Sequence, residues 1–502
     1  MKKIKIILMS FVTLFAVNGC DEEDFALSNP SGLSPETYFR TEAQVQSAVN
    51  AIYANMQTIG LYTRLYFFEM DNMSHENAGN PQLEADKRAF LEYSFDASHP
   101  PISWYWDSCY RGINKANFVI NNEERINAIP SSLLSDEKKA RFIGEAKYMR
   151  AFYYFLLVTR FGDIPLITDI PDDGSGFPRT PREQVYDQIV TDLNDASQSL
   201  WEKDRTENGR ATQGAAYALL GKTHLYREQY QQALDAFDDI YGEYSLEDDY
   251  FANFREEEEF GPESIFEVQF DDDLGNSAVW NSNSSGEDAN EVTFRGQEYG
   301  FNDWFNVYPS EDLLDEYEEG DIRFDETFYT DGDSWAGETV IRTGPAPSPV
   351  PEGETYIPLE RRAAWRKYQN YYKDVNEDQA SGINMKVIRY ADVLLMMAEA
   401  ENALGNQSEA IGYINEVRER AELDPLPMDL SQEEVFDAIV HERMVELAGE
   451  QVRFPDLVRW GLAADYLSEY GFQAGKNELW PIPNDEISAN ENIGQEDQNP
   501  GY

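Results

Sequence analysis

The first strong pattern along the chain is an apolar stripe with helical spacing near the N-terminal end. Apolar residues recur there every three or four positions, which predicts an α-helix whose buried face is Val45, Ala48, Val49, Ile52 and Tyr53. Ser34 and Pro35 supply a capping residue and a proline at the first helical position. We therefore expect one helix from Ser34 to about Met56.

Two further helices follow in the same pattern. One covers roughly residues 106–126, and the other runs from Glu145 to Phe161. The second is apolar on nearly every side, which is typical of a helix buried in the protein interior. Gly162 directly after it, with Pro165 close behind, indicates that the helix ends there.

The remaining helical patterns are a single helix over residues 180–200 and two helix pairs joined by short turns. The pairs cover 211–227 with 231–241 and 390–404 with 408–420. In each pair a segment, 218–240 or 391–418, resembles a tetratricopeptide repeat, with small and apolar residues at the spacing of two packed helices. Because the pairs lie far apart in the sequence, we expect them to meet through the fold rather than as a simple array.

Residues 265–375 have a different pattern. Residues 265–270 alternate between apolar and polar side chains as a β-strand does, and a long stretch rich in Gly, Asn, Ser and Pro follows. A long irregular segment in a helical protein is usually functional or disordered. Its aromatic density argues against disorder, because it contains Trp280, Trp304, Trp335 and Trp365.

The N-terminus has the pattern of an export signal. Lys2, Lys3 and Lys5 precede an apolar run from Ile6 to Val17, which is too short to span a bilayer. The sequence VNGC, ending at Cys20, resembles a bacterial lipobox, in which the cysteine carries the lipid anchor. Residues 1–19 are therefore expected to be a signal peptide and residues 20–35 a lipidated, flexible tether.

The charge balance narrows the ligand class. The chain has 40 basic and 94 acidic residues, a net charge of −54. Such a surface repels nucleic acid and anionic lipid headgroups, so a neutral small molecule or neutral polymer fits it better. Two cysteines cannot build a disulfide framework.

Four blocks of sequence resemble one family, the SusD/RagB-like lipoproteins of Bacteroidetes polysaccharide-utilization systems. They are EAKYMRAFYYFLLVTRFGDIPLI (145–167), RYADVLLMMAEAENALG (389–405), HERMVELAGEQVRFPDLVRWG (441–461) and the tail from LWPIPNDEI to QNPGY (479–502). Their order and spacing cover nearly the whole chain. The departure from the family pattern is Pro455, which affects one turn.

The resemblance implies a mainly α SusD-like fold, with tetratricopeptide-like helix pairs supporting an irregular, loop-rich ligand-binding region with a few short strands. Residues 36–264 and 376–502 would form the helical scaffold, and residues 265–375 would be a loop-rich insertion. It also implies a lipid anchor on the outer face of the outer membrane, a SusC-like TonB-dependent transporter as partner, and glycan binding without catalysis. Asp21–Asp24 resemble the export signal of related lipoproteins.

The block from His441 to Arg459 contains the densest charge in the sequence. On a helix Glu442, Glu446 and Glu450 are neighbours that need cationic partners, and Arg443, Arg453 and Arg459 are available. We interpret the block as a structural ion-pair network rather than a catalytic pair. Val445 stands where a zinc-protease motif would need its second histidine, so no zinc site is expected. The acidic runs 256–259 and 271–273 could hold calcium, but a solvated acidic surface is the favoured interpretation, and the sequence predicts no metal and no cofactor.

The aromatic side chains are the candidate ligand platform, because sugar rings stack their apolar C–H faces on flat rings. Trp280, Trp304 and Trp335 lie in polar, glycine-rich stretches where they cannot bury all their area locally, and Trp104 joins them as a freer ring before a helix. Loop packing is the alternative for each of them. Trp106, in W-x3-Y-x2-I-x3-N spacing, is predicted to pack in the core instead.

A polar segment completes the candidate site. Residues 69–82 (EMDNMSHENAGNPQ) lack apolar periodicity and carry the polar side chains Asp71, Asn72, His75, Glu76 and Asn80. In the family the equivalent loop often supplies polar contacts to glycan, and the alternative is a plain surface loop.

The combined prediction is a cell-surface lipoprotein that captures a neutral oligosaccharide or polysaccharide, such as the β-glucan laminarin, and delivers it to a SusC-like transporter. Two alternatives stay open, a peptide-binding RagB-like member and a structural adaptor of the transporter. A glycoside hydrolase is the least favoured, because the sequence points to no particular pair of flanking carboxylates.

Overall fold

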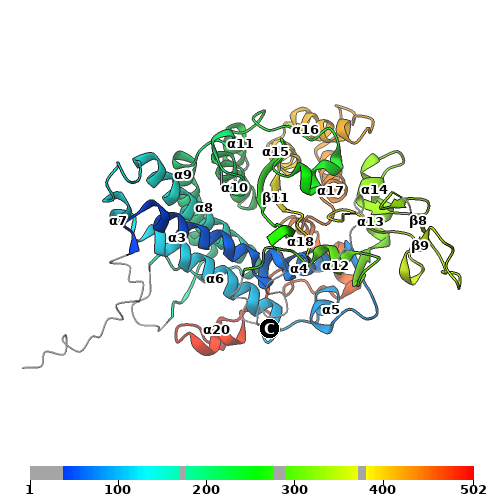
Figure 1. Ribbon diagram of the computed structural model, residues 1–502, viewed down its shortest axis with the longest axis horizontal. Helices are drawn as coiled ribbons and strands as arrows, with labels where there is room; N and C mark the ends of the chain where they lie inside the picture. Colours follow the sequence, from blue (N-terminus) through cyan, green and yellow to red (C-terminus); the bar gives the residue numbers. More distant parts are fainter. Residues whose placement is uncertain (1–37, 170–175, 275–288, 338, 371–379) are drawn as a thin grey trace, which may run out of the picture.

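The computed structural model describes residues 38–169, 176–274, 289–337, 339–370 and 380–502, and within them the protein is mainly α-helical (Figure 1). The predicted fold class is therefore confirmed. The helices before the insertion are α3 (Glu42–Ala54), α4 (Leu65–Met73), α5 (Ala85–Leu91), α6 (Pro100–Ile120), α7 (Glu123–Asn127), α8 (Asp136–Phe161), α9 (Arg182–Ser199), α10 (Gln213–Tyr226) and α11 (Tyr230–Asp238).

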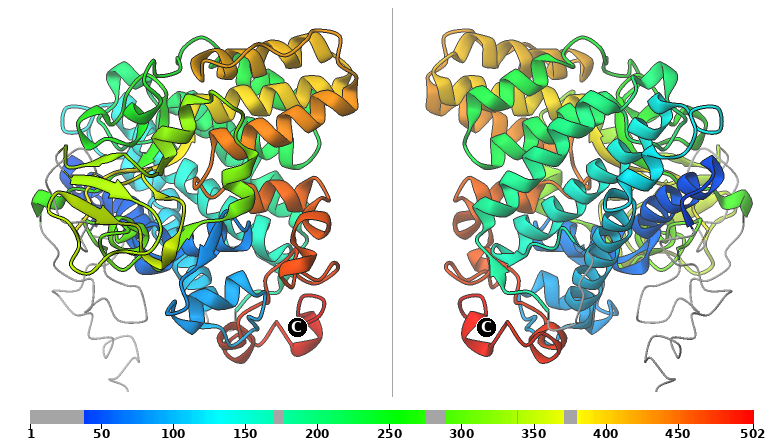
Figure 2. Two further views of the ribbon diagram at one scale, coloured as in Figure 1. Left: turned by 90° about the vertical axis from the view of Figure 1, so that its right-hand side faces the viewer. Right: turned by 90° about the vertical axis from the view of Figure 1, so that its left-hand side faces the viewer.

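Helical structure resumes after the insertion. Its helices are α15 (Tyr390–Leu404), α16 (Gln407–Arg420), α17 (Gln432–Glu446), α18 (Arg453–Arg459), α19 (Ala463–Leu467) and α20 (Asn484–Ala489). Helix α8 packs against α9, α9 against α10, α10 against α11, α11 against α15, and α15 against both α16 and α17. The two predicted repeat pairs thus meet through the fold, side by side along the upper edge of the molecule (Figures 1 and 2).

Helix α3 begins later than its sequence pattern predicts. The helix starts at Glu42, because Thr41 forms a capping box with Gln44 in which each side chain bonds the backbone of the other residue. The predicted single helix from Ser34 is wrong within the described residues, since Phe39 to Thr41 are not helical. Residues 34–37 lie outside the part of the chain that the structure describes.

The two long central helices begin earlier in the chain than predicted. Helix α6 begins at Pro100, with proline in the first turn, and α8 begins at Asp136, where the Ser135 side chain caps the Lys138 amide. The charged first turn of α8 hid its start from an apolar periodicity, and the two prolines at the start of α6 gave no apolar helical stripe there. The end of α8 at Gly162 is confirmed, and Gly162 has a positive φ of 71°.

Trp106 packs in the core, as its helical spacing predicts. The Trp106 side chain is 2% exposed, Ile113 is fully buried, and the Asn117 amide donates to the carbonyl of Ile167 at 2.8 Å. Trp480 meets Phe161 edge to face nearby, with ring centroids 5.7 Å apart. These contacts belong to the large hydrophobic core that the helical scaffold shares.

Between α11 and α15 the chain forms short helices, and short strands pair both there and in earlier parts of the chain. The helices are α12 (Arg295–Tyr299), α13 (Glu311–Glu316) and α14 (Ile322–Thr327). The strands pair antiparallel as β1 (Asn77–Gly79) with β5 (Val307–Pro309), β2 (Ile164–Pro165) with β3 (Arg179–Thr180), β4 (Ser264–Val268) with β11 (Met385–Arg389), and β6 (Phe328–Tyr329) with β10 (Ala364–Trp365). A mixed sheet joins β7 (Ser334–Trp335), β8 (Thr339–Arg342) and β9 (Glu354–Tyr356).

The insertion has its own small cores. One cluster packs Phe67 and Phe68 of α4 with Tyr299, Phe328 and Trp365. A second cluster holds Phe301, Phe305, Tyr308, Tyr329, Ile341, Ile357 and Ala364. Pairing of β4 with β11 holds the two ends of the insertion together, and β8 and β9 lie at the side of the molecule opposite α7 (Figure 1). The predicted boundaries near residues 265 and 375 stay predictions.

A buried arginine–glutamate network joins the insertion to the helical scaffold. We define it as Arg323, Arg389, Arg420, Glu263, Glu442, Glu446 and Glu450. Six of these residues are 8% exposed or less as whole residues, and the side chain of the seventh, Arg420, is 5% exposed. Arg323 binds Glu442 at 2.5 Å and Glu446 at 2.9 Å, and Arg389 binds Glu450 at 2.8 Å. Burial by itself would raise the pKa of Glu446, but Arg420, Arg389 and Arg323 hold that pKa well below its ordinary value.

The structural interpretation of this charged block is confirmed, but the expected partners are not. Arg443 pairs with Asp392 and Asp456, and Arg459 pairs with Glu399 and Asp456. The predicted pairing inside the block is therefore wrong for the three glutamates, which take arginines from α14, β11 and α16. The sequence pattern shows which residues are i,i+4 neighbours on one helix. It does not show which arginines of distant segments will contact that helix after folding.

Replacing Arg389 by methionine is expected to lower the free energy of unfolding by about 3–5 kcal/mol, because it leaves buried carboxylates without their cation. Urea denaturation followed by far-UV circular dichroism measures the change. Arg205→Met is the matched control, since its pair with Glu137 is about half exposed and is worth about 0–1 kcal/mol. An equal, small effect of both substitutions would contradict the structural role of the network.

Candidate functional site

Trp304 lies just after α12, where the chain turns back toward β5. Its backbone amide donates to the carbonyl of Gln297 at 3.2 Å, and the next residue, Phe305, has a positive φ of 47°. Phe305 is buried in the insertion core, while the Trp304 side chain is only half-buried. The turn therefore anchors one aromatic residue inside and leaves the neighbouring indole partly accessible.

Arg64, which the sequence pattern did not single out, lies beside this indole. Its guanidinium carbon is 5.9 Å from the Trp304 ring centroid, near the outer limit of a cation–π contact. The Arg64 Nε donates to Glu298 at 2.6 Å, and its Nη2 donates to Glu84 at 3.3 Å. These carboxylates fix the position of the guanidinium and compensate its charge. Local sequence offered no signal for this, because Arg64 and Glu298 are neighbours only in space.

Asn80 is the predicted polar residue that the structure brings to Trp304. Its side-chain amide donates to the carbonyl of Phe305 at 2.9 Å, and its backbone amide donates to the carbonyl of Asn306 at 2.9 Å. Asn306 in turn donates to Glu298 at 2.5 Å. Half-buried Asn80 and half-buried Trp304 thus belong to one polar and aromatic region, which we call the Trp304 site.

The other predicted tryptophans have different places. Trp335 on β7 is half-buried and packs against the insertion core that contains Phe305. Trp104 on α6 is also half-buried, and its carbonyl group lies so close to Gly60 that a Cβ there would approach the oxygen to 2.6 Å. Trp280 and the predicted lipidation site Cys20 lie outside the described residues.

The expectation of an exposed polar loop over residues 69–82 is corrected by the structure. Helix α4 continues to Met73, and Asp71, Asn72 and Glu76 are 0%, 0% and 1% exposed. Asp71 accepts from the Tyr299 hydroxyl at 2.8 Å, and the Asn72 amide donates to the carbonyl of Lys87 at 3.2 Å. Their polar groups bind protein, because α12, α5 and the turn after α17 cover this segment.

Glu76 is bonded on both oxygens. The Gly449 amide donates to one oxygen at 3.1 Å and the Ser74 hydroxyl to the other at 2.9 Å. Burial and the nearby Asp71 raise the pKa of Glu76 to about 8. Burial likewise raises the pKa of Asp71 above its ordinary value, against the opposing charge of Arg295.

The His75 ring contacts other protein groups and is not available to a ligand. Its ring stacks on Tyr470 with centroids 3.6 Å apart, and its Nε2 donates to the carbonyl of Leu91 at 2.9 Å. Burial lowers the His75 pKa to about 4, so the ring is neutral at pH 7. Among the described residues no group of three or more His, Cys, Asp or Glu could hold a metal ion. The helices that the structure describes are all too short or too polar to cross a bilayer.

Comparison with known proteins places the chain among relatives along its full length. The model of the SusD family matches residues 262–502, and a model described as starch-binding associating with outer membrane matches residues 27–225. SusD-like protein P2 of Formosa agariphila is 30% identical over 537 residues, covering 100% of both chains. Starch-binding protein SusD of Bacteroides thetaiotaomicron is 22% identical, covering 85% of this chain and 82% of that protein.

A solved structure described as a laminarin binding SusD-like protein superposes with a TM-score of 0.77 at 29% identity, over 92% of this chain and 100% of that chain. The fold and the site define a helical-repeat scaffold protein that carries an aromatic region on its insertion. The chain belongs to the SusD family.

The buried carboxyl of Glu76 predicts a measurable pH dependence. Its pKa is raised in the folded state, so the group favours folding at low pH and this contribution is lost between about pH 4.5 and pH 8. Over that window the free energy of unfolding falls by at most about 1.4 kcal/mol per pH unit from this group. Glu76→Gln is expected to give a flatter profile in urea denaturation at pH 5, 6, 7 and 8.

Glu202→Gln serves as the control, because Glu202 is exposed. A Glu76→Gln profile that parallels the profiles of the native protein and this control would contradict the buried, protonated carboxyl.

Proposed function

We propose that the protein is a cell-surface lipoprotein that captures a neutral glycan at the Trp304 site and delivers it to a SusC-like TonB-dependent transporter. The observation that carries the proposal is the half-buried indole of Trp304, held beside the paired guanidinium of Arg64 and the polar groups of Asn80 and Asn306. Membership of the SusD family supports it.

The chemistry of the Trp304 site suits a sugar. The apolar C–H face of a pyranose ring can stack on the indole, and its hydroxyls need donors and acceptors at the ring edge. Asn80, Asn306 and Arg64 supply such groups, and each is already positioned by a bond to the protein. A preorganised site loses little conformational entropy when the ligand binds.

The charges at the site favour a neutral ligand. Arg64, the arginine that the described residues place beside the indole, is bound to Glu298 and Glu84, so little of its positive charge remains for a uronate or a sulfate group. The chain as a whole carries a net charge of −54, which repels polyanions. The relative that is 29% identical and is described as laminarin binding supports a β-glucan of the laminarin type as the ligand.

Binding without catalysis is the other part of the proposal. A glycosidase needs two carboxyl groups flanking the bond that it cleaves. At the Trp304 site the Glu298 side chain is 0% exposed, and its two oxygens accept from Arg64 and Asn306. This carboxylate is committed to structure, which supports a capture role.

Replacing Trp304 by alanine is expected to weaken laminarin retention in native affinity gels by about tenfold or more, because a central aromatic anchor is typically worth about 2 kcal/mol. Trp460→Ala is the matched control. Trp460 is also half-buried but packs on Phe436 and Arg459 of the scaffold. Unchanged retention of the Trp304 variant would rule out stacking there, and released reducing ends after prolonged incubation with laminarin would rule out a purely binding role.

The proposal also includes a lipid anchor on Cys20 and a signal for export to the cell surface in Asp21–Asp24. Cys20→Ala is expected to abolish metabolic labelling with a radioactive fatty acid and to release the protein from the outer-membrane fraction, because several acyl chains are needed for firm anchoring. Cys109→Ala is the control, since that thiol is buried. Retention of Cys20→Ala in the membrane fraction would show that another contact holds the protein there.

A further inference from the structure

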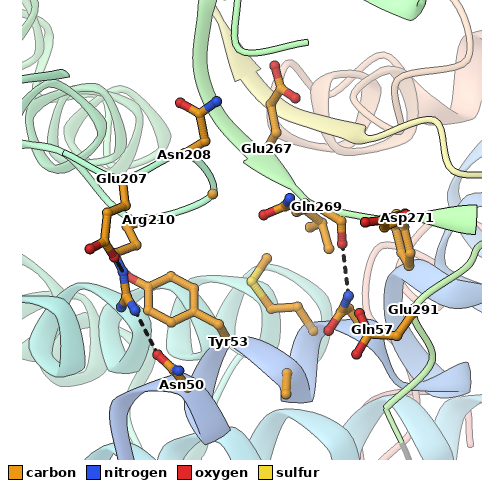
Figure 3. Close-up of a pocket in the computed structure, with 15 residues that line it drawn as sticks. Asn50, Tyr53, Gln57, Glu207, Asn208, Arg210, Glu267, Gln269, Asp271 and Glu291 are labelled. Atoms are coloured by element: carbon orange, nitrogen blue, oxygen red, sulfur yellow. Dashed lines mark hydrogen bonds and ion pairs between the residues drawn. The ribbon is translucent and has the colours of Figure 1, made fainter. Parts of the chain in front are cut away.

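A second region of the molecule has the form of a ligand site. A cavity of about 380 Å³ opens between α3, the turn at residues 207–210 and the end of β4 (Figure 3). This volume lies within the range of about 300–1,000 Å³ that is typical of small-molecule sites. The lining contains none of Trp304, Trp335, Trp104 and Asn80, so the cavity is separate from the Trp304 site.

Hydrogen bonds fasten the walls of the cavity to one another. Arg210 binds Asn50 on α3 at 2.8 Å and Glu207 at 2.7 Å, and its third bond, to buried Glu145, is 2.9 Å long. Across the opening the Gln57 amide donates to the backbone carbonyl of Gln269 at 2.9 Å (Figure 3). The cavity is therefore preorganised, and a ligand would not have to order its walls.

Gly209 brings the turn and the strand end unusually close. Its φ is +80°, and a Cβ at this position would lie 2.7 Å from the Gln269 side-chain oxygen. A residue with a side chain would be strained in that conformation and would push against Gln269. The close approach brings Asn208, on the turn, and Gln269, at the strand end, into the lining of the same cavity (Figure 3).

The polar groups at the rim suit hydroxyls. The amides of Asn208 and Gln269 are exposed, and neither they nor the Glu291 carboxylate makes a side-chain hydrogen bond that the structure assigns among the described residues. An amide offers donors and an acceptor at once, which matches a hydroxyl group that can do both. The ring of Tyr53 and the side chain of Met56 supply an apolar surface in the same lining.

The charge of the lining excludes an anionic ligand. Glu207, Asp271 and Glu291 are carboxylates, whereas the one arginine, Arg210, is committed to the three bonds described above. A uronate or sulfate group would meet uncompensated negative charge there. Amides, carboxylates and an aromatic ring together favour a neutral molecule rich in hydroxyls.

We infer that this cavity is a second saccharide subsite, which takes a short segment of a neutral glycan independently of the Trp304 site. The inference rests on the proposed function, since it assumes that the protein binds neutral β-glucan. A second contact on the same chain would raise the avidity for a polymer without requiring tight binding at either site.

Saturation-transfer NMR with laminaribiose on the Trp304→Ala variant tests the inference. The variant is expected to retain a signal, and adding Asn208→Ala and Gln269→Ala is expected to reduce it by about tenfold through the loss of two hydrogen-bonding amides. The matched control adds Asn194→Ala and Gln198→Ala on exposed positions of α9, whose amides donate, among the described residues, to Val190 and Ser197 of their own helix. This control is expected to leave the signal unchanged.

The outcomes separate the two proposals. A native protein that binds laminaribiose, with a Trp304→Ala signal that is absent or insensitive to the cavity pair, would overturn the second subsite and leave the Trp304 site standing. A native protein that neither gives a signal nor is retained by laminarin would overturn the proposed function and the subsite together. A signal of similar strength from glucuronic acid would overturn the charge argument for the cavity.

Discussion

The rest of the structure depends on the ion pairs of one buried carboxylate, that of Glu446. It is fully buried and binds Arg323, Arg389 and Arg420, which come from α14, β11 and α16. Moving a carboxylate out of water costs several kcal/mol unless cations and hydrogen bonds compensate it. Native packing is therefore favoured only when all three segments reach α17 together. In this way one charge fixes the insertion to the part of the helical scaffold that follows it in the chain.

A second network of buried hydrogen bonds holds the Trp304 site in position. The Tyr299 hydroxyl on α12 donates to Asp71 and accepts from the Asn77 amide, while Trp365 donates to Asn77 at 2.8 Å. Because Tyr299 ends α12, these bonds hold the short helix that carries Gln297 and Glu298. Those two residues position Trp304 and Arg64. The accessible indole thus stands on a rigid buried base rather than on a free loop.

In both the Trp304 site and the cavity beside α3, the positive charge of an arginine is neutralised by carboxylates of the protein. Each contains one arginine, Arg64 or Arg210, and each arginine is bound to carboxylates of the protein. These arginines therefore hold segments of the protein together and do not serve as binding groups for an anionic ligand. Amide groups and aromatic rings are left to meet a ligand, which agrees with a chain whose net charge is −54.

Local patterns determined much of this protein. Apolar periodicity and caps predicted α9, α10, α15 and α16 to within a few residues, because those signals depend on neighbours in sequence. The helical spacing of Trp106 and the charge density after His441 also identified structural roles correctly. Only the tertiary structure decided that Asp71 and Glu76 are interior, that Asn80 and Arg64 meet Trp304, and that Asn208 and Gln269 face one cavity. The physical reason is that burial and pairing of a polar side chain are set by segments distant in the chain, which no local pattern encodes.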